Sequence, residues 1–345
     1  MNVYFIIVCF LGLVLCIFAF YTNHTLRSYL FRKKILKKRS PFFDYYEFDN
    51  IYETVINQLN MKDIKKEHKN NYTILFKSIC LFVLSFSIFL FPQIKDFYEL
   101  FFIIWFLLFG YSCFLLENIS HKHYKEDFIS NLIQAIVPKI KYKITINSEK
   151  IKNELYLQSR FDKNELHQQY LLELPHCDID TKITDYMEYQ LDSDTNIELV
   201  DILSRELGED SAVYIFEGIL AKIPKKNFLN NHILIKRNKK LFKRNDNNKS
   251  FKKYFFLYNE NMENIDDIIT NNIKETLVQL YEEYGILFEI SIINNSLYIR
   301  FFTGPLFESS WKPSFSSNKE KLYGDYVIFK TVLELIEKIN DIIEF

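Results

Sequence analysis

Two histidines and two acids that could bind a metal ion lie close together in the first half of the chain. His121 and His123 are followed by Glu126 and Asp127, and imidazole and carboxylate groups are common ligands of zinc. Residues two apart on a helix point to nearly opposite sides, so the two histidines would not converge on one ion. The spacing therefore predicts no metal site here.

A second candidate for chemistry is the sequence His176-Cys177-Asp178, with Asp180 close behind. A cysteine becomes a nucleophile when a histidine takes its proton and a third group orients that histidine. Neighbours in one loop rarely adopt this geometry, and the chain has no phosphate-binding loop, dinucleotide-binding glycine motif or nucleophile elbow. We therefore predict no catalytic residue and no cofactor, and an enzyme that uses Cys177 or His176 stays an alternative.

Basic residues dominate the segment from 225 to 253, where Asp246 is the opposing acid. Such a segment can contact the anionic cytoplasmic leaflet, where each base contributes about 1 kcal/mol, or it can be a solvated loop between two strands. The net charge of −1, and the lack of an evident stacking platform beyond Phe242 and Phe251 among the bases from 236 to 253, argue against nucleic-acid binding. The residues expected to contact anionic lipid or a partner are Lys225, Lys226, Lys236, Arg237, Lys239, Lys240, Lys243 and Arg244.

Three apolar blocks in the first third of the chain determine on which side of a membrane these residues are expected. They cover residues 3–20, 74–91 and 98–116, and each is long enough, at about 1.5 Å per residue, to cross a hydrocarbon layer of about 30 Å. Residues 27–39 contain lysines and arginines but no acid, and bases close to a span stay in the cytoplasm. The pattern predicts a multi-pass protein of the inner (cytoplasmic) membrane, with its N-terminus outside and its C-terminal domain in the cytoplasm.

The expected organisation follows from these blocks. The first block is expected to be a retained anchor rather than a cleaved signal peptide, because no base precedes it and no small-residue cleavage site follows it. The predicted regions are 1–22, a transmembrane helix; 23–72, a basic loop and an amphipathic helix; 73–117, a transmembrane helical hairpin; and 118–345, a cytosolic domain. That domain contains one cysteine, Cys177, and so no disulfide framework is expected.

Hydrophobic periodicity predicts the elements of the soluble part. Helices are expected at residues 48–59, 128–137, 265–284 and 326–343, and strands at 143–146, 212–223, 233–236, 254–258, 286–293 and 297–302. Turns are expected at residues 224–227 and 294–295, where proline, lysine and asparagine interrupt the apolar runs. Strands and helices mix without a βαβ rhythm, so we predict an α+β domain with a mixed or antiparallel sheet and flanking helices.

A loop rich in aromatic residues follows the last predicted strand, between residues 304 and 313. Phe307 and Trp311 could anchor a partner from this loop, or they could pack over the end of the sheet. We favour packing over the sheet.

Several segments of the C-terminal half resemble the DUF3137 family. Residues 213–228 contain Phe-Glu-Gly followed by apolar residues and then Lys-Lys-Asn-Phe, residues 290–299 end in Asn-Ser-Leu-Tyr-Ile, and residues 304–308 read Gly-Pro-Leu-Phe-Glu. The resemblance extends roughly from residue 74 to the end, and the extra N-terminal span departs from the usual form. It implies a bacterial membrane protein with a cytosolic α+β domain. The family has no assigned function, so it implies no catalytic residues.

Taken together, these patterns predict a non-enzymatic membrane protein whose cytosolic domain is an interaction or scaffold module. A domain without convergent ionisable residues beside a full membrane region motivates this hypothesis. The expected partners are membrane lipids and a protein, either a different chain or a second copy, and not nucleic acid. One alternative is a module that binds lipid headgroups through residues 225–253, and another is an enzyme not recognised from its motifs.

Overall fold

The chain forms two compact units. The first consists of Met1–Tyr45, Lys139–Leu306 and Gly324–Phe345, and the second of Tyr46–Pro138 and Phe307–Tyr323. These units divide the chain differently from the boundaries expected from the sequence. The computed structural model describes residues 32–59, 61–87, 104, 106–108, 111, 123–144, 178–193, 195–207, 212–237, 249–259, 268–308 and 319–343.

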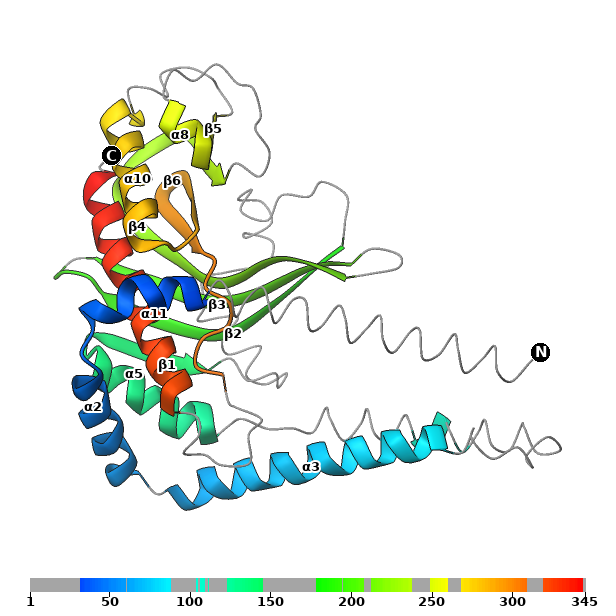
Figure 1. Cartoon of the computed structure of the whole chain (residues 1–345). Helices are drawn as coiled ribbons and strands as arrows, with labels where there is room; N and C mark the ends of the chain where they lie inside the picture. Colours follow the sequence, from blue (N-terminus) through cyan, green and yellow to red (C-terminus); the bar gives the residue numbers. More distant parts are fainter. Residues whose placement is uncertain are drawn as a thin grey trace, which may run out of the picture. The chain divides into compact units, whose positions relative to one another are not determined.

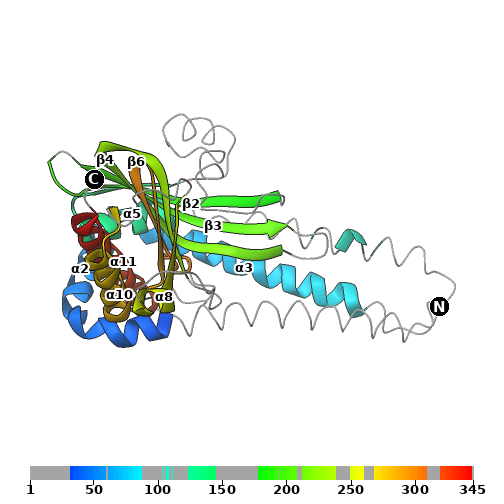
Figure 2. The ribbon, with the colours of Figure 1, turned by 90° about the horizontal axis from the view of Figure 1, so that it is seen from above.

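The described part of the first unit is built on a six-stranded antiparallel sheet in which β4 is the longest strand (Figure 1). Its order is β1-β2-β3-β4-β5, and β6 pairs with β4 as well. The helices α10 and α11 lie along one face of the sheet (Figure 2), which confirms the predicted α+β fold. The bounds are β1 Ile140–Ile144, β2 Asp178–Gln190, β3 Asn196–Leu207, β4 Ala212–Arg237, α8 Lys249–Tyr254, β5 Phe255–Asn259, α10 Asn271–Tyr284, β6 Phe288–Phe301 and α11 Lys319–Ile342.

Stacked phenylalanines fill part of the core of the first unit. Phe255 of β5 lies against Phe288 of β6 with ring centroids 5.3 Å apart, and Phe288 in turn contacts Phe301 at 6.4 Å. All three side chains are buried. Aromatic pairs contribute about 0.5–1.5 kcal/mol beyond the burial of their surface, so some of the aromatic residues of this chain stabilise the sheet.

The two turns predicted inside the sheet are wrong. β4 continues through residues 224–227, and β6 continues through residues 294–295. The two strands pair from Ile219 opposite Phe301 to Ile235 opposite Ile290. Between these pairs β4 advances by more residues than β6, and the register shifts. Proline and asparagine tolerate the irregular backbone of a bulge as well as that of a turn, so here they bend a strand rather than end it.

The predicted helices of the first unit are present with changed starts. α10 begins at Asn271 rather than at residue 265, because the side chain of Thr270 accepts a hydrogen bond from the N–H of Ile273 at 3.4 Å and caps the helix. Gly285, with φ of 71°, ends α10 as predicted. α11 begins at Lys319, earlier than the predicted residue 326, and β1 lies slightly before its predicted position.

The second unit is helical in its described residues. α2 (Tyr45–Gln58) and the pair formed by the π-helix η4 (Tyr124–Ile129) and α5 (Ser130–Ile136) confirm the two predicted amphipathic helices. Tyr52 of α2 contacts Phe128 of η4 edge to face, with ring centroids 5.8 Å apart. The ring centroids of Phe48 and Tyr323 are 5.5 Å apart, and Phe307 is buried. The apolar face of α2 therefore packs within this unit, and Phe307 packs in the core rather than in an exposed loop.

The three predicted membrane spans lie mostly outside the described residues. Residues 3–20 lie outside entirely, and of residues 98–116 the structure describes 104, 106–108 and 111. The second apolar block begins inside α3, which runs without interruption from Met61 to Ser87. Among the described residues, no helix has both the length and the apolar character needed to cross a membrane. The spans therefore stay a prediction.

Candidate functional site

A helix of residues 32–39, placed by the sequence in a basic loop, packs through its arginines against the rest of the first unit, to which it belongs. The guanidinium of Arg32 donates to the carboxylate of Asp325 on α11 and to the carbonyl oxygen of Pro305 at 2.8 Å. Asp325 is fully buried, and 16% of the Arg32 side chain is exposed. Ile35, which follows Arg32 by almost one turn, is also fully buried. The helix is therefore part of the folded domain.

Further carboxylates surround Arg32. Burial lowers the pKa of Arg32, and the charges of Asp201 and Glu217 oppose this effect. Asp201 lies opposite Asp185 in the neighbouring strand, and both are buried. Asp201 accepts a hydrogen bond from the N–H of Leu306 at 3.3 Å, and Asp185 accepts one from the hydroxyl of Tyr142. We call Arg32, Asp201, Glu217 and Asp325 the Arg32 pocket.

The chemistry of the Arg32 pocket is that of a buried ion-pair network. Neighbouring carboxylates can act as an acid and a base when their pKa values differ, but here a guanidinium lies among them and pairs with Asp325. The pocket therefore attaches helix 32–39 to the sheet and to α11.

Sequence reasoning missed this pocket because its members are distant in the chain. One signal was present: Asp201 interrupts the apolar run of β3, and Asp325 interrupts that of α11. Acids are almost never fully buried without a partner, so two acids within apolar runs indicate a cation elsewhere. The sequence does not indicate which of the many bases provides it.

A second arginine of the same helix is held by aromatic rings. Arg39 pairs with Glu334 at 2.5 Å, and its guanidinium lies 4.3 Å from the ring centroid of Tyr284 and 5.6 Å from that of Phe43. Lys38 adds a hydrogen bond from its ammonium to the carbonyl oxygen of Glu282 at 2.6 Å. Contacts of arginine with ring faces contribute roughly 0.5–2 kcal/mol, and the larger values apply when they are desolvated. Both ends of helix 32–39 are therefore fixed to the first unit.

Another buried ion-pair network joins β4 and β6. Glu289 accepts hydrogen bonds from Arg300 and, at 3.1 Å, from Arg237. The guanidinium of Arg237 also lies 3.6 Å from the ring centroid of Phe302. Burial raises the pKa of Glu289, but the charges of Arg300 and Arg237 and the hydrogen bonds from Arg237 outweigh burial and hold that pKa below its ordinary value.

This lowered pKa predicts acid lability. The stabilisation is complete above the ordinary glutamate pKa of 4.5 and is lost as the pH falls through the lower pKa of the folded state. Glu289→Gln should lower the free energy of unfolding at neutral pH by about 2 kcal/mol, because buried donors lose a charged acceptor. It should also flatten the acid limb of a plot of stability against pH, measured by urea unfolding. Glu275→Gln on the exposed side of α10 is the control, and an unchanged acid limb in Glu289→Gln would contradict the assignment.

The structure places two of the predicted lipid-contacting residues in contacts within the domain. The ammonium of Lys225 donates to the carbonyl oxygens of Asn340 and Ile343, at 3.2 and 2.6 Å, at the C-terminal end of α11. Arg237 pairs with Glu289, as described above. Lys236 is partly buried on β4. Lys239, Lys240, Lys243 and Arg244 lie outside the described residues, as does the side chain of Lys226, so the prediction of lipid contact stays untested for them.

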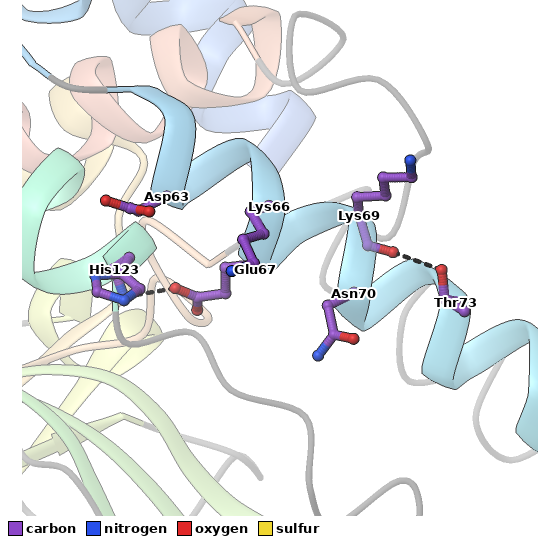
Figure 3. A pocket seen from close by; sticks show the side chains of 7 residues that line it. All are labelled: Asp63, Lys66, Glu67, Lys69, Asn70, Thr73 and His123. Atoms are coloured by element: carbon purple, nitrogen blue, oxygen red, sulfur yellow. Dashed lines mark hydrogen bonds between the residues drawn. The ribbon is translucent and has the colours of Figure 1, made fainter.

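In the second unit, a hollow of about 430 Å³ lies beside the polar half of α3 (Figure 3). The Glu67 side chain points toward His123, which precedes η4, and accepts a hydrogen bond from the backbone N–H of His123 at 2.6 Å. The imidazole of His123 lies 2.9 Å from the carboxylate of Asp127. The residues that line the hollow are Asp63, Lys66, Glu67, Lys69, Asn70, Thr73 and His123.

Glu67 therefore connects α3 to the residue that precedes η4. Burial raises the pKa of Glu67, while the hydrogen bond from His123 opposes this effect. The hydrogen bond to Asp127 raises the pKa of His123. A hydrogen bond to an ionised acceptor is stronger than one between neutral groups. We call the contact between Glu67 and His123 the α3–η4 junction.

Removal of this hydrogen bond should loosen η4. We expect Glu67→Ala to cost about 1 kcal/mol locally and Glu67→Gln to cost less, since the amide oxygen can still accept the hydrogen bond. Amide hydrogen exchange of residues 123–129 should then accelerate about fivefold in Glu67→Ala, the ratio that corresponds to this energy. Asp63→Ala, one turn earlier on α3, is the matched control. Equal acceleration in both variants would show that the hydrogen bond is not the cause.

Among the described residues, neither the His121–Asp127 motif nor the His176–Asp180 motif forms a site. Of the first motif, His123 contacts Asp127 and Glu67, while His121 lies outside the described residues. His176 and Cys177 also lie outside them. Within the part of the chain that is described, no three histidine, cysteine or acidic side chains are grouped as metal ligands.

Comparison with known proteins identifies one family. Neither the curated proteins nor the solved structures contain a match to this chain. The model of a family described as a protein of unknown function, DUF3137, matches residues 214–341, a shorter stretch than the resemblance from residue 74 onward. The match includes most of β4, all of α10 and β6, and nearly all of α11. Over residues 214–341, the chain therefore matches the DUF3137 family, as its sequence motifs predicted.

Proposed function

We propose that the chain is a multi-pass protein of the cytoplasmic membrane whose α+β domain is a non-enzymatic interaction module on the cytoplasmic side. The observation that carries the proposal is the α3–η4 junction. Glu67 precedes the second apolar block, His123 follows the third, and the two residues are hydrogen-bonded. The two flanks of the apolar segment are therefore joined to each other, as a helical hairpin across a bilayer requires.

The surface of the intervening residues supports a membrane environment. Phe76 and Ile79 on α3 are 58% and 53% exposed, and Phe106, Leu107 and Tyr111 are 54–64% exposed. Large apolar side chains that face outward together indicate a partner or a lipid phase rather than water. The apolar part of α3 follows directly on its charged first turns, which agrees with passage from the aqueous phase into a bilayer.

Buried charges support the non-enzymatic part of the proposal. In the Arg32 pocket and around Glu289, charged groups from different elements pair with one another. Strongly perturbed ionisable groups in an open cleft would favour an active site, whereas these groups join strands and helices. Their role is to hold the domain and helix 32–39 together.

Membrane insertion is tested by extraction of the membrane fraction with alkaline carbonate. We expect the chain to stay in the pellet, and reporter fusions should give an external N-terminus and an internal C-terminus. Release by carbonate would exclude the membrane part of the proposal. Native mass spectrometry of the protein in mild detergent then tests the interaction module, and we expect a stoichiometric protein partner. Its reproducible absence would exclude the module.

A further inference from the structure

Helix 32–39 has two faces of different chemistry. Arg32, Ile35 and Arg39 are directed into the first unit, as described above. Lys33, Lys34 and Lys37 are exposed. At 100° per residue the first set lies on one side of the helix and the second on the opposite side. We call Lys33, Lys34 and Lys37 the lysine face.

The division between arginine and lysine has a physical reason. A guanidinium forms planar, bidentate hydrogen bonds and stacks on rings, so it suits the paired and aromatic surroundings of Arg32 and Arg39. An ammonium is strongly hydrated and suits an exposed position near diffuse negative charge. The buried face therefore attaches the helix, and the exposed face presents positive charge in a fixed direction.

An aromatic residue extends the same exposed segment. Phe42 of the 3₁₀-helix η1 (Ser40–Phe42) is 72% exposed, and the guanidinium of Arg39 lies 4.8 Å from its ring centroid. Exposed aromatic rings beside lysines are typical of segments that rest on a bilayer, where the ring enters the headgroup layer and the ammonium groups remain with the phosphates.

We propose that the lysine face binds the anionic surface of the membrane, with phospholipid phosphates as the ligand, and so orients the domain on the bilayer. This inference rests on the proposed function, because the predicted first span ends at residue 20 and residues 21–31 link it to helix 32–39. That link spans at most about 40 Å, so the lysines can reach the headgroups, where attraction to anionic lipid acts over about 8–10 Å at physiological salt. It assigns lipid contact to residues 33–37 rather than to residues 225–253.

The test uses the full chain in nanodiscs of phosphatidylcholine alone and of phosphatidylcholine mixed with phosphatidylglycerol. Amine acetylation, followed by mass spectrometry, reports the reactivity of each lysine. In the anionic nanodiscs we expect acetylation of Lys33, Lys34 and Lys37 to slow about fivefold and to recover in high salt. Lys239, Lys240 and Lys243 are the internal control, and their rates should be the same in both nanodiscs.

A variant makes the same test independently. The triple change Lys33→Gln, Lys34→Gln and Lys37→Gln should reduce the phosphatidylglycerol that the protein retains in native mass spectrometry. The matched triple change at Lys239, Lys240 and Lys243 should not. Equal acetylation rates of the lysine face in the two nanodiscs would overturn the inference. So would slow acetylation of these lysines in native membranes, if neither nanodisc reproduces it. The second result would assign the lysine face to an acidic protein. Neither outcome would affect the proposed membrane insertion, which carbonate extraction tests separately.

Discussion

Arg32→Met should destabilise the first unit by about 3–5 kcal/mol, the usual cost when one partner of a buried ion pair is removed. Asp325 is fully buried and would lose a charged hydrogen-bond donor, and Asp201 and Glu217 would lose a neighbouring positive charge. Methionine retains the volume of the side chain, so the effect reports charge rather than a cavity. Chemical unfolding of the full chain in detergent measures the loss.

The controls for Arg32 use its own helix and its own partner. Lys33→Met changes an exposed neighbour and should alter stability by less than about 0.5 kcal/mol. Combination of Arg32→Met with Asp325→Leu should recover part of the loss, because an apolar pair can replace a buried ion pair at little cost. Full stability of Arg32→Met at neutral pH would show that the pocket does not attach the helix.

Gly218→Ala should unfold the sheet or lower its stability by about 4 kcal/mol or more, which is exceptional for a single change. Gly218 has φ of 149°, which other residues rarely adopt, and an added Cβ would lie 2.1 Å from the carbonyl oxygen of Phe301 and 2.8 Å from the N–H nitrogen of Thr303. Both contacts are with backbone atoms of the segment that ends β6. β4 and the end of β6 would have to separate at the centre of the sheet.

Gly324→Ala is the matched control for this prediction. Gly324 lies inside α11, and an added Cβ would meet the tip of Leu36 at 3.3 Å, a side chain that can move. Alanine gains about 1 kcal/mol over glycine inside a helix, which offsets this close contact, so we expect little net change. Thermal unfolding followed by circular dichroism compares the two variants. Similar unfolding of both would show that the close approach at Gly218 is not required.

The elements whose sequences follow a simple hydrophobic period could be predicted from the sequence. The apolar stripes of α2 and α11 and the glycine that ends α10 identified those elements, and the Phe-Glu-Gly motif that contains Gly218 pointed to the family. In each case the local pattern and the tertiary environment favour the same structure. Periodicity of this kind identifies elements well and their exact ends less well, as the starts of α10 and α11 illustrate.

The errors arose where local chemistry permits two structures. Residues 224–227 and 294–295 have the composition of turns, yet β4 and β6 pair with each other before and after them, and the irregularity becomes register shifts. The basic run at residues 27–39 resembles a solvated loop, yet Arg32 and Arg39 are held by acids and rings from remote parts of the chain. Pairing between distant residues carries no local signal, so a single sequence cannot assign it.

The hydrogen bond between Glu67 and His123 also bears on how chains of this kind can change during evolution. A segment whose two ends are joined at its base can be lengthened, shortened or exchanged with little effect on the packing of the rest, as with domains inserted at surface sites. The Glu67 acceptor at one end and the first turn of η4 at the other must then stay. Under the proposed membrane insertion, the residues between them would be exchangeable as one segment, with a composition that follows the thickness and the lipids of the host membrane.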